Sequence, residues 1–133
     1  MAYDWLISEG NSVPFVASLE ISAGEWVLGS GSDDTVVPAS VGSDALGIAA
    51  TDAYDDATPG TANKQVAVYM SGLVKTIVHA SADVNIGDDL EIEDKVTLVN
   101  AGGSNVIVAQ ACDFLASGST STIRVRICRK SKA

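Results

Sequence analysis

The chain has 133 residues, 47% of them apolar and 19% charged, with a formal net charge of −9. This length predicts a single domain. The apolar content excludes a disordered acidic tail, and the negative charge excludes a typical duplex-binding domain. The charge is also uneven, because residues 1–63 hold ten acids and no Lys or Arg, whereas residues 123–133 hold five of the eight bases and no acid.

Three features of the sequence concern its compartment. No apolar run reaches the roughly 18 residues that span a membrane. The first residues, from Met1 to Trp5, lack the basic region and apolar stretch of a signal peptide. The two cysteines do not make a secreted disulfide scaffold. We therefore expect a protein that is made in a cytoplasm and has no membrane partner.

Short runs of β-prone residues follow one another along the chain, separated by glycine turns. The clearest is 122–128, where Ile123, Val125 and Ile127 alternate with Arg124 and Arg126. Strands are expected over residues 15–19, 26–28, 35–37, 46–50, 65–71, 73–78, 89–94, 96–99, 106–109 and 122–128. The pattern predicts an all-β sandwich or barrel. At most one or two short helical turns are expected, in 51–57 and 109–117.

An internal repeat divides the chain. Its first matching segments are Gly24-Glu25-Trp26-Val27-Leu28 and Gly87-Asp88-Asp89-Leu90-Glu91. The matches continue along both halves: 35–37 with 97–99, 46–49 with 107–110, Asp52 with Asp113, and 66–68 with 123–125. The repeat covers about 21–79 and 84–128, and predicts one domain, 21–133, built from two similar β-units packed together. Residues 1–20 precede the repeat and are expected to hold an N-terminal arm and a first strand.

Two segments are suited to binding a partner. The apolar arm either forms the first strand of the domain or pairs with the sheet edge of a neighbouring subunit. The basic end of the chain is either a solvated strand face or a docking patch for an acidic protein surface. Its candidate residues are Arg124, Arg126, Arg129, Lys130 and Lys132.

Reactive groups show no catalytic or metal-binding pattern. The one histidine, His79, has no partner in motif spacing, and no Gly-x-Ser-x-Gly elbow occurs. The acidic run 88–94 does not match a calcium loop, and its alternation places Asp89, Glu91 and Glu93 on one exposed strand face. The cysteines do not form a zinc motif, and we expect them to be small, semi-buried residues, opposite Thr51 and Ser71 in the repeat. No enzyme, cofactor or metal site is expected.

The segments Val66-Ala67-Val68-Tyr69-Met70-Ser71-Gly72-Leu73-Val74-Lys75, Ala82-Asp83-Val84-Asn85-Ile86-Gly87-Asp88-Asp89-Leu90 and Ile21-Ser22-Ala23-Gly24-Glu25-Trp26-Val27 resemble the small head decoration (cement) proteins of tailed bacterial and archaeal viruses. The resemblance implies a small β-barrel of the β-tulip kind. It also implies a homotrimer that binds the major capsid protein on the outside of the expanded head, at three-fold points, and stabilises the shell. Such a protein has no catalytic residues and never meets nucleic acid.

In that family an N-terminal arm adds to a capsid strand, a role that would fall here on Ala2, Tyr3, Asp4, Trp5, Leu6 and Ile7. Subunit or capsid docking would fall on Arg124, Arg126, Arg129 and Lys130. Two alternatives stay open: another virion part, such as a head fibre base, tail or baseplate protein, and a small non-catalytic β-module that binds sugars or cations.

Overall fold

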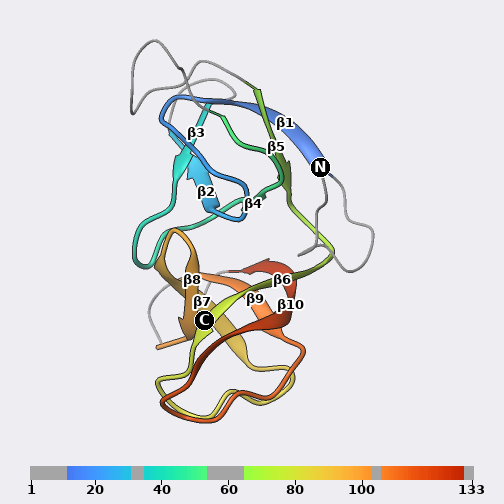
Figure 1. Ribbon diagram of the computed structural model, residues 1–133. Coiled ribbons are helices and arrows are strands. Elements are labelled where there is room, and N and C mark those ends of the chain that lie inside the picture. The colour runs from blue at the N-terminus through green and yellow to red at the C-terminus, as the bar shows by residue number, and fades with distance from the viewer. Residues whose placement is uncertain (1–11, 31–34, 54–64, 103–105, 131–133) are drawn as a thin grey trace.

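The computed structural model describes residues 12–30, 35–53, 65–102 and 106–130, and for 129 and 130 it describes the backbone only. These residues form two closed barrels of five strands each, one above the other in Figure 1. The first has the strand order β1-β3-β2-β4-β5, and the second has the order β10-β6-β8-β7-β9. The strands are β1 (Ser12–Ala17), β2 (Trp26–Gly29), β3 (Thr35–Pro38), β4 (Gly47–Ala49), β5 (Gln65–Tyr69), β6 (Leu73–His79), β7 (Asp89–Asp94), β8 (Thr97–Asn100), β9 (Ile107–Ala111) and β10 (Thr120–Lys130).

The predicted all-β class is confirmed, and each expected strand corresponds to one of these ten. The part of the chain that the structure describes has no helix, and so none that could span a membrane. A helical turn in 109–117 is therefore wrong. The reason is that pairing with distant segments takes backbone groups that a helix would need: Leu115 exchanges hydrogen bonds with Val84 in an isolated β-bridge, and Cys112 N–H donates to Arg124 O. Most of the other expected turn, 51–57, lies outside the described residues.

Both barrels have the same connectivity. In the first, β1 pairs in parallel with β3 and antiparallel with β5; in the second, β6 pairs in the same way with β8 and β10. The structural repeat thus begins at β1, earlier than the sequence pattern places it. The sequence hides this relation because β1 has Pro14 and Phe15 where β6 has Lys75 and Thr76.

The hydrogen bonds also correct the alignment of the repeat by one residue. Ala50 N–H donates to Ala67 O, as Cys112 N–H donates to Arg124 O. Cys112 therefore matches Ala50 rather than Thr51. It follows that the counterpart of Asp113 is Thr51 and not Asp52.

A glycine turn leads into the second strand of each barrel. The two turns are residues 22–25 and 85–88, and in each the N–H of the fourth residue donates to the carbonyl oxygen of the first. The third residue of each turn is a glycine, Gly24 with φ of 94° and Gly87 with φ of 95°. Only glycine takes this conformation without strain. The fourth side chain, Glu25 or Asp88, accepts the first N–H of its turn. The shared Gly-acid pattern in the sequence therefore has one structural cause.

Trp26 holds the two barrels together. Its side chain is fully buried in a cluster that contains residues of both barrels. Its Nε1–H donates to Thr76 Oγ1 at 3.2 Å, and its backbone N–H donates to Lys95 O at 2.6 Å. Next to it, Lys95 Nζ lies 3.2 Å from Oε2 of the buried Glu25. The apolar cluster and these polar contacts together join the two barrels.

One side chain of β7 departs from the expected alternation. Leu90 and Ile92 are buried as predicted, but Glu91 is also only 8% exposed, so the expectation that it shares an exposed face is wrong. Gly102, which follows β8, lies against it, and its N–H donates to Glu91 Oε2 at 3.2 Å. This loop contact satisfies the buried carboxylate.

Candidate docking surface

The strands β6 and β10 form a ribbon whose outer face is basic. Ile123, Val125 and Ile127 point into the barrel and are buried, while Arg124 and Arg126 are exposed, as predicted. The register places Lys75 of β6 directly opposite Arg124. We call Lys75, Arg124 and Arg126 the basic ribbon. Of the four Lys and Arg side chains that the structure describes, only Lys95 lies elsewhere.

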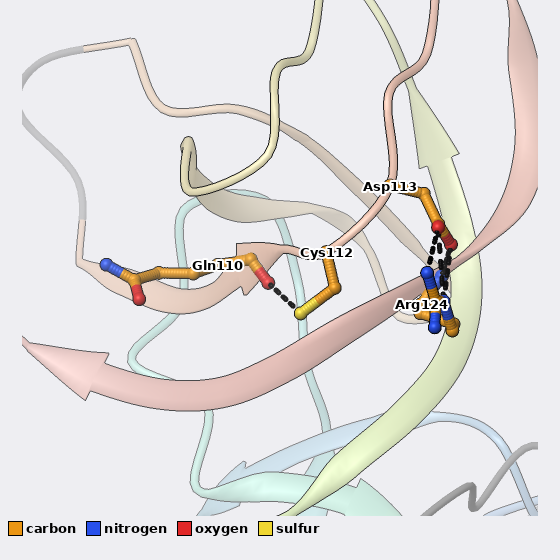
Figure 2. A network of polar contacts seen from close by, with 4 residues as sticks. All are labelled: Gln110, Cys112, Asp113 and Arg124. Carbon is orange, nitrogen blue, oxygen red and sulfur yellow. Dashed lines mark hydrogen bonds and ion pairs between the residues drawn. The ribbon is translucent and has the colours of Figure 1, made fainter.

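Arg124 is held by a carboxylate from the segment after β9. Its Nη2–H donates to Asp113 Oδ1 at 2.7 Å, and its Nε–H lies 3.1 Å from both carboxylate oxygens. Its backbone N–H donates to Asp113 Oδ2 at 2.8 Å (Figure 2). These hydrogen bonds lower the pKa of Asp113 below its ordinary value, and the carboxylate raises the pKa of Arg124. Arg124 is thereby fixed in place and partly neutralised.

The Asp113–Arg124 pair predicts a pH dependence. Because the pKa of Asp113 is lowered in the folded state, the pair contributes stability above the unfolded-state pKa and loses it as the pH falls through the folded-state pKa. The stability difference between wild type and Asp113→Asn should therefore be present at neutral pH and vanish in strong acid. Urea unfolding at several pH values measures it.

A titration gives the matching site-specific test. In Arg124→Gln, the Asp113 pKa read by NMR of the carboxyl carbon should rise toward the ordinary range, about 3.9. Arg126→Gln is the matched control, since Arg126 is an exposed neighbour on the same strand and none of the hydrogen bonds or charges that lower this pKa come from it. An equal rise in both variants would show that general charge, not the hydrogen bonds, sets this pKa.

Three shallow hollows lie along the ribbon. The first, about 290 Å³, lies between the barrels, and we call it the inter-barrel groove; the other two measure about 340 Å³ and 390 Å³. Their linings are Ala23, Gly24, Lys75, Thr76, Ile77, Val96 and Thr122 for the groove; Gly72, Leu73, Cys112 and Arg126 for the second; and Lys75, Asp113, Thr122, Ile123 and Arg124 for the third. Each hollow thus borders the basic ribbon.

The other reactive groups of the described residues lie apart from one another. His79 lies at the end of β6, and its Nδ1 is 2.8 Å from Glu93 Oε1 in a partly exposed pair. Both cysteines are free and half-buried, and Cys112 Sγ donates to Gln110 O at 3.9 Å (Figure 2). Within the described ranges, no group of three or more His, Cys, Asp or Glu side chains could hold a metal ion.

Some predicted site residues cannot be placed on this surface. Residues 2–7 of the arm and Lys132 lie outside the described residues, as do the side chains of Arg129 and Lys130. The backbone of Lys130 belongs to β10 and lies opposite Ile107. Lys75 is not among the docking residues predicted from the sequence, and it joins the site through its register with Arg124. The alternating pattern of β6 places Lys75 on the outward face, and this signal could have identified it from the sequence.

Comparison with known proteins finds similarity among solved structures. No protein-family model matches the sequence, and no curated protein matches it. Among solved structures, the chain is similar to the N base of the head fibre protein gp8.5 of bacteriophage phi29, with a TM-score of 0.59 and 20% sequence identity. The alignment covers 92% of this chain and 98% of that chain. At this identity the likeness shows that the two chains share a fold over nearly their whole lengths.

Proposed function

We propose that this chain is a non-enzymatic structural protein of a tailed-virus particle that binds the outer surface of the head. The carrying observation is the fold shared with the base of a phage head fibre across both barrels. The resemblance of residues 66–75 and 82–90 to head decoration proteins supports the same placement. Such a protein, made in the host cytoplasm, needs a rigid scaffold and no catalytic centre.

The finer role that we propose is decoration: a homotrimer bound to the major capsid protein, which stabilises the expanded shell. A second candidate is the base of a head fibre, which the comparison favours directly. A density map of the intact particle distinguishes the two. A decoration protein ends at its two barrels and raises the temperature at which the head opens, whereas a fibre base carries outward density and leaves that temperature unchanged.

The decisive first experiment is binding to expanded heads that lack the protein. We expect saturable binding at three-fold positions. Heads that bind none of the added protein, at any concentration tested, would remove both candidates and leave a tail or baseplate protein and a small binding module as the remaining hypotheses.

We further propose that Arg124 and Arg126 of the basic ribbon face the shell. The chain is strongly acidic overall, so a cluster of exposed cations is the part of its described surface that suits an acidic protein partner. Arg126 is the residue to test, because Arg124 also holds Asp113. Arg126→Glu should weaken head binding about tenfold, or ~1.4 kcal/mol, and reduce its sensitivity to salt.

A control variant separates local charge from net charge. Leu19→Glu with Val41→Glu adds the same two negative charges at exposed positions of the first barrel. Head binding of this double variant should match wild type when measured by co-sedimentation. If Arg126→Glu also binds like wild type, the ribbon is a solvated face and the shell contact lies elsewhere.

A further inference from the structure

One stretch of β6 extends beyond its partner strand. β6 pairs with β10 over its full length, Leu73–His79, but it pairs with β8 only from Ile77 onward. On the side away from β10, the residues before Ile77 therefore continue past the end of β8. This stretch lines the inter-barrel groove through Lys75 and Thr76.

The hydrogen bonds of Arg124 show which way the backbone of Lys75 points. Arg124 N–H donates to Asp113 and Arg124 O accepts from Cys112 N–H, so both backbone groups of Arg124 face β9. In an antiparallel ladder this makes Arg124 and Lys75 a non-hydrogen-bonded pair. The N–H and C=O of Lys75 consequently point away from β10, toward the groove. Val96 N–H, just before β8, is engaged by Asp94 Oδ1 at 2.9 Å.

In the first barrel, a proline occupies the position that corresponds to Lys75. Pro14 lies opposite Ala67 as Lys75 lies opposite Arg124. Proline has no N–H and blocks the addition of a strand at an edge. The two barrels therefore differ at the residue that decides whether a further strand can pair with this edge. The second barrel has an edge that can accept another strand.

The groove around this edge suits a segment with apolar and acidic side chains. Ile77 and Val96 line it and are 38% and 37% exposed. Ala23 and Gly24 form part of its opposite wall, and Lys75 supplies a positive charge. Main-chain bonds from an added strand would give affinity, and this lining would give specificity.

We propose that residues 2–7 of a second copy of this chain add to β6 as a strand in the inter-barrel groove. The segment reads Ala-Tyr-Asp-Trp-Leu-Ile, in which Tyr3, Trp5 and Ile7 share one face of an extended chain. Asp4 complements Lys75, and no base occurs before residue 64. This inference deepens the homotrimer of the proposed function and rests on it. It assigns the arm to a sister subunit rather than to the shell.

The topology favours a second copy over the chain's own arm. Ser12, where β1 begins, lies opposite Tyr69. A straight continuation of β1 would run beside the residues after Tyr69, but β10 occupies that position, since Ile127 N–H donates to Gly72 O at 3.0 Å. The open edge of β6 is the opposite one, so the chain's own arm would have to cross the ribbon. An arm that enters a neighbour's groove makes a head-to-tail contact, which three copies close into a ring.

Two variants separate the two sides of this contact. Deletion of residues 2–7 removes the arm and keeps the groove. Lys75→Pro keeps the arm and copies the proline that β1 has at the same position, while Lys75→Ala keeps the N–H and serves as the matched control. By light scattering, the full chain and Lys75→Ala should be trimers. The mass of the deletion variant and of Lys75→Pro should fall to about one third.

Mixing the two defective variants is the sharpest test. The deletion variant offers only a groove and Lys75→Pro only an arm, so together they should form a one-to-one dimer although each alone is a monomer. If Lys75→Pro does not fold, Asp4→Lys replaces it. This variant should weaken association about tenfold, and Lys75→Glu should restore it.

Each contrary result has a distinct meaning. A full chain that is monomeric in solution, a trimer that survives the deletion, or a mixture that forms no dimer overturns the inference. Equal dissociation of Lys75→Ala and Lys75→Pro overturns strand addition. Head binding is measured in parallel: if the full chain binds heads while the arm has no effect on association, the proposed function stands and the inference fails. If the deletion variant stays trimeric but no longer binds heads, the arm belongs to the shell.

Discussion

Trp26→Ala is expected to lower the free energy of unfolding by about 3–5 kcal/mol. Trp26 is fully buried, and its cluster contains Val74 and Leu90 of the other barrel. The substitution leaves a cavity at the junction and removes the donor to Thr76. Because this side chain couples the barrels, urea unfolding that is one transition in wild type should separate into two.

Trp26→Phe is the control for this experiment. It keeps an aromatic ring at the junction and loses only the Nε1–H bond and some volume, so it should cost about 1–2 kcal/mol and keep one transition. Circular dichroism at matched urea concentrations measures both variants. A loss below about 1 kcal/mol for Trp26→Ala would mean that the rest of the junction holds the barrels together without it.

Gly47→Ala is expected to destabilise the first barrel by about 2–4 kcal/mol. A Cβ at this position would overlap the backbone carbonyl oxygen of Tyr69, which cannot move as a flexible side chain would. Tyr69 ends β5, where the chain leaves the first barrel for the second. Glycine at position 47 therefore allows β4 to approach the backbone at this exit.

Gly29→Ala is the matched control, because no atom lies within 4 Å of a Cβ there and its φ is not in the left-handed region. Its stability should lie within about 0.5 kcal/mol of wild type. Urea midpoints compare the two variants directly. If both variants unfold like wild type, β5 shifts at Tyr69 without cost.

The strands were predictable because their signal is local. Alternation in 65–71 and 122–128 identifies the buried faces of β5 and β10 without knowledge of the neighbours. The place of β1 was not predictable in the same way. β1 and β6 are equivalent in the strands with which they pair and not in their residue types. Pro14 and Lys75, for example, occupy equivalent positions but share no property that a sequence comparison detects.

The candidate site was predictable only in part, for the same reason. The exposed positions of Arg124 and Arg126 follow from alternation within one strand. The grouping of Lys75, Arg124 and Asp113 depends on the register of three segments that are distant in sequence. The burial of Glu91 depends on the loop at Gly102, which a pattern within β7 does not record.

Barrel closure has a consequence for the protein at high concentration. A sheet that closes on itself presents little edge to neighbouring molecules, and exposed edges are where unrelated chains start to aggregate. Proline protects the incompletely paired part of β1, and a lysine charge protects that of β6. A neutral or basic strand gains little electrostatic energy from approaching the charge of Lys75, whereas an acidic strand is attracted to it. In the strand addition that we propose, this one side chain would disfavour unrelated strands and still admit the acidic arm.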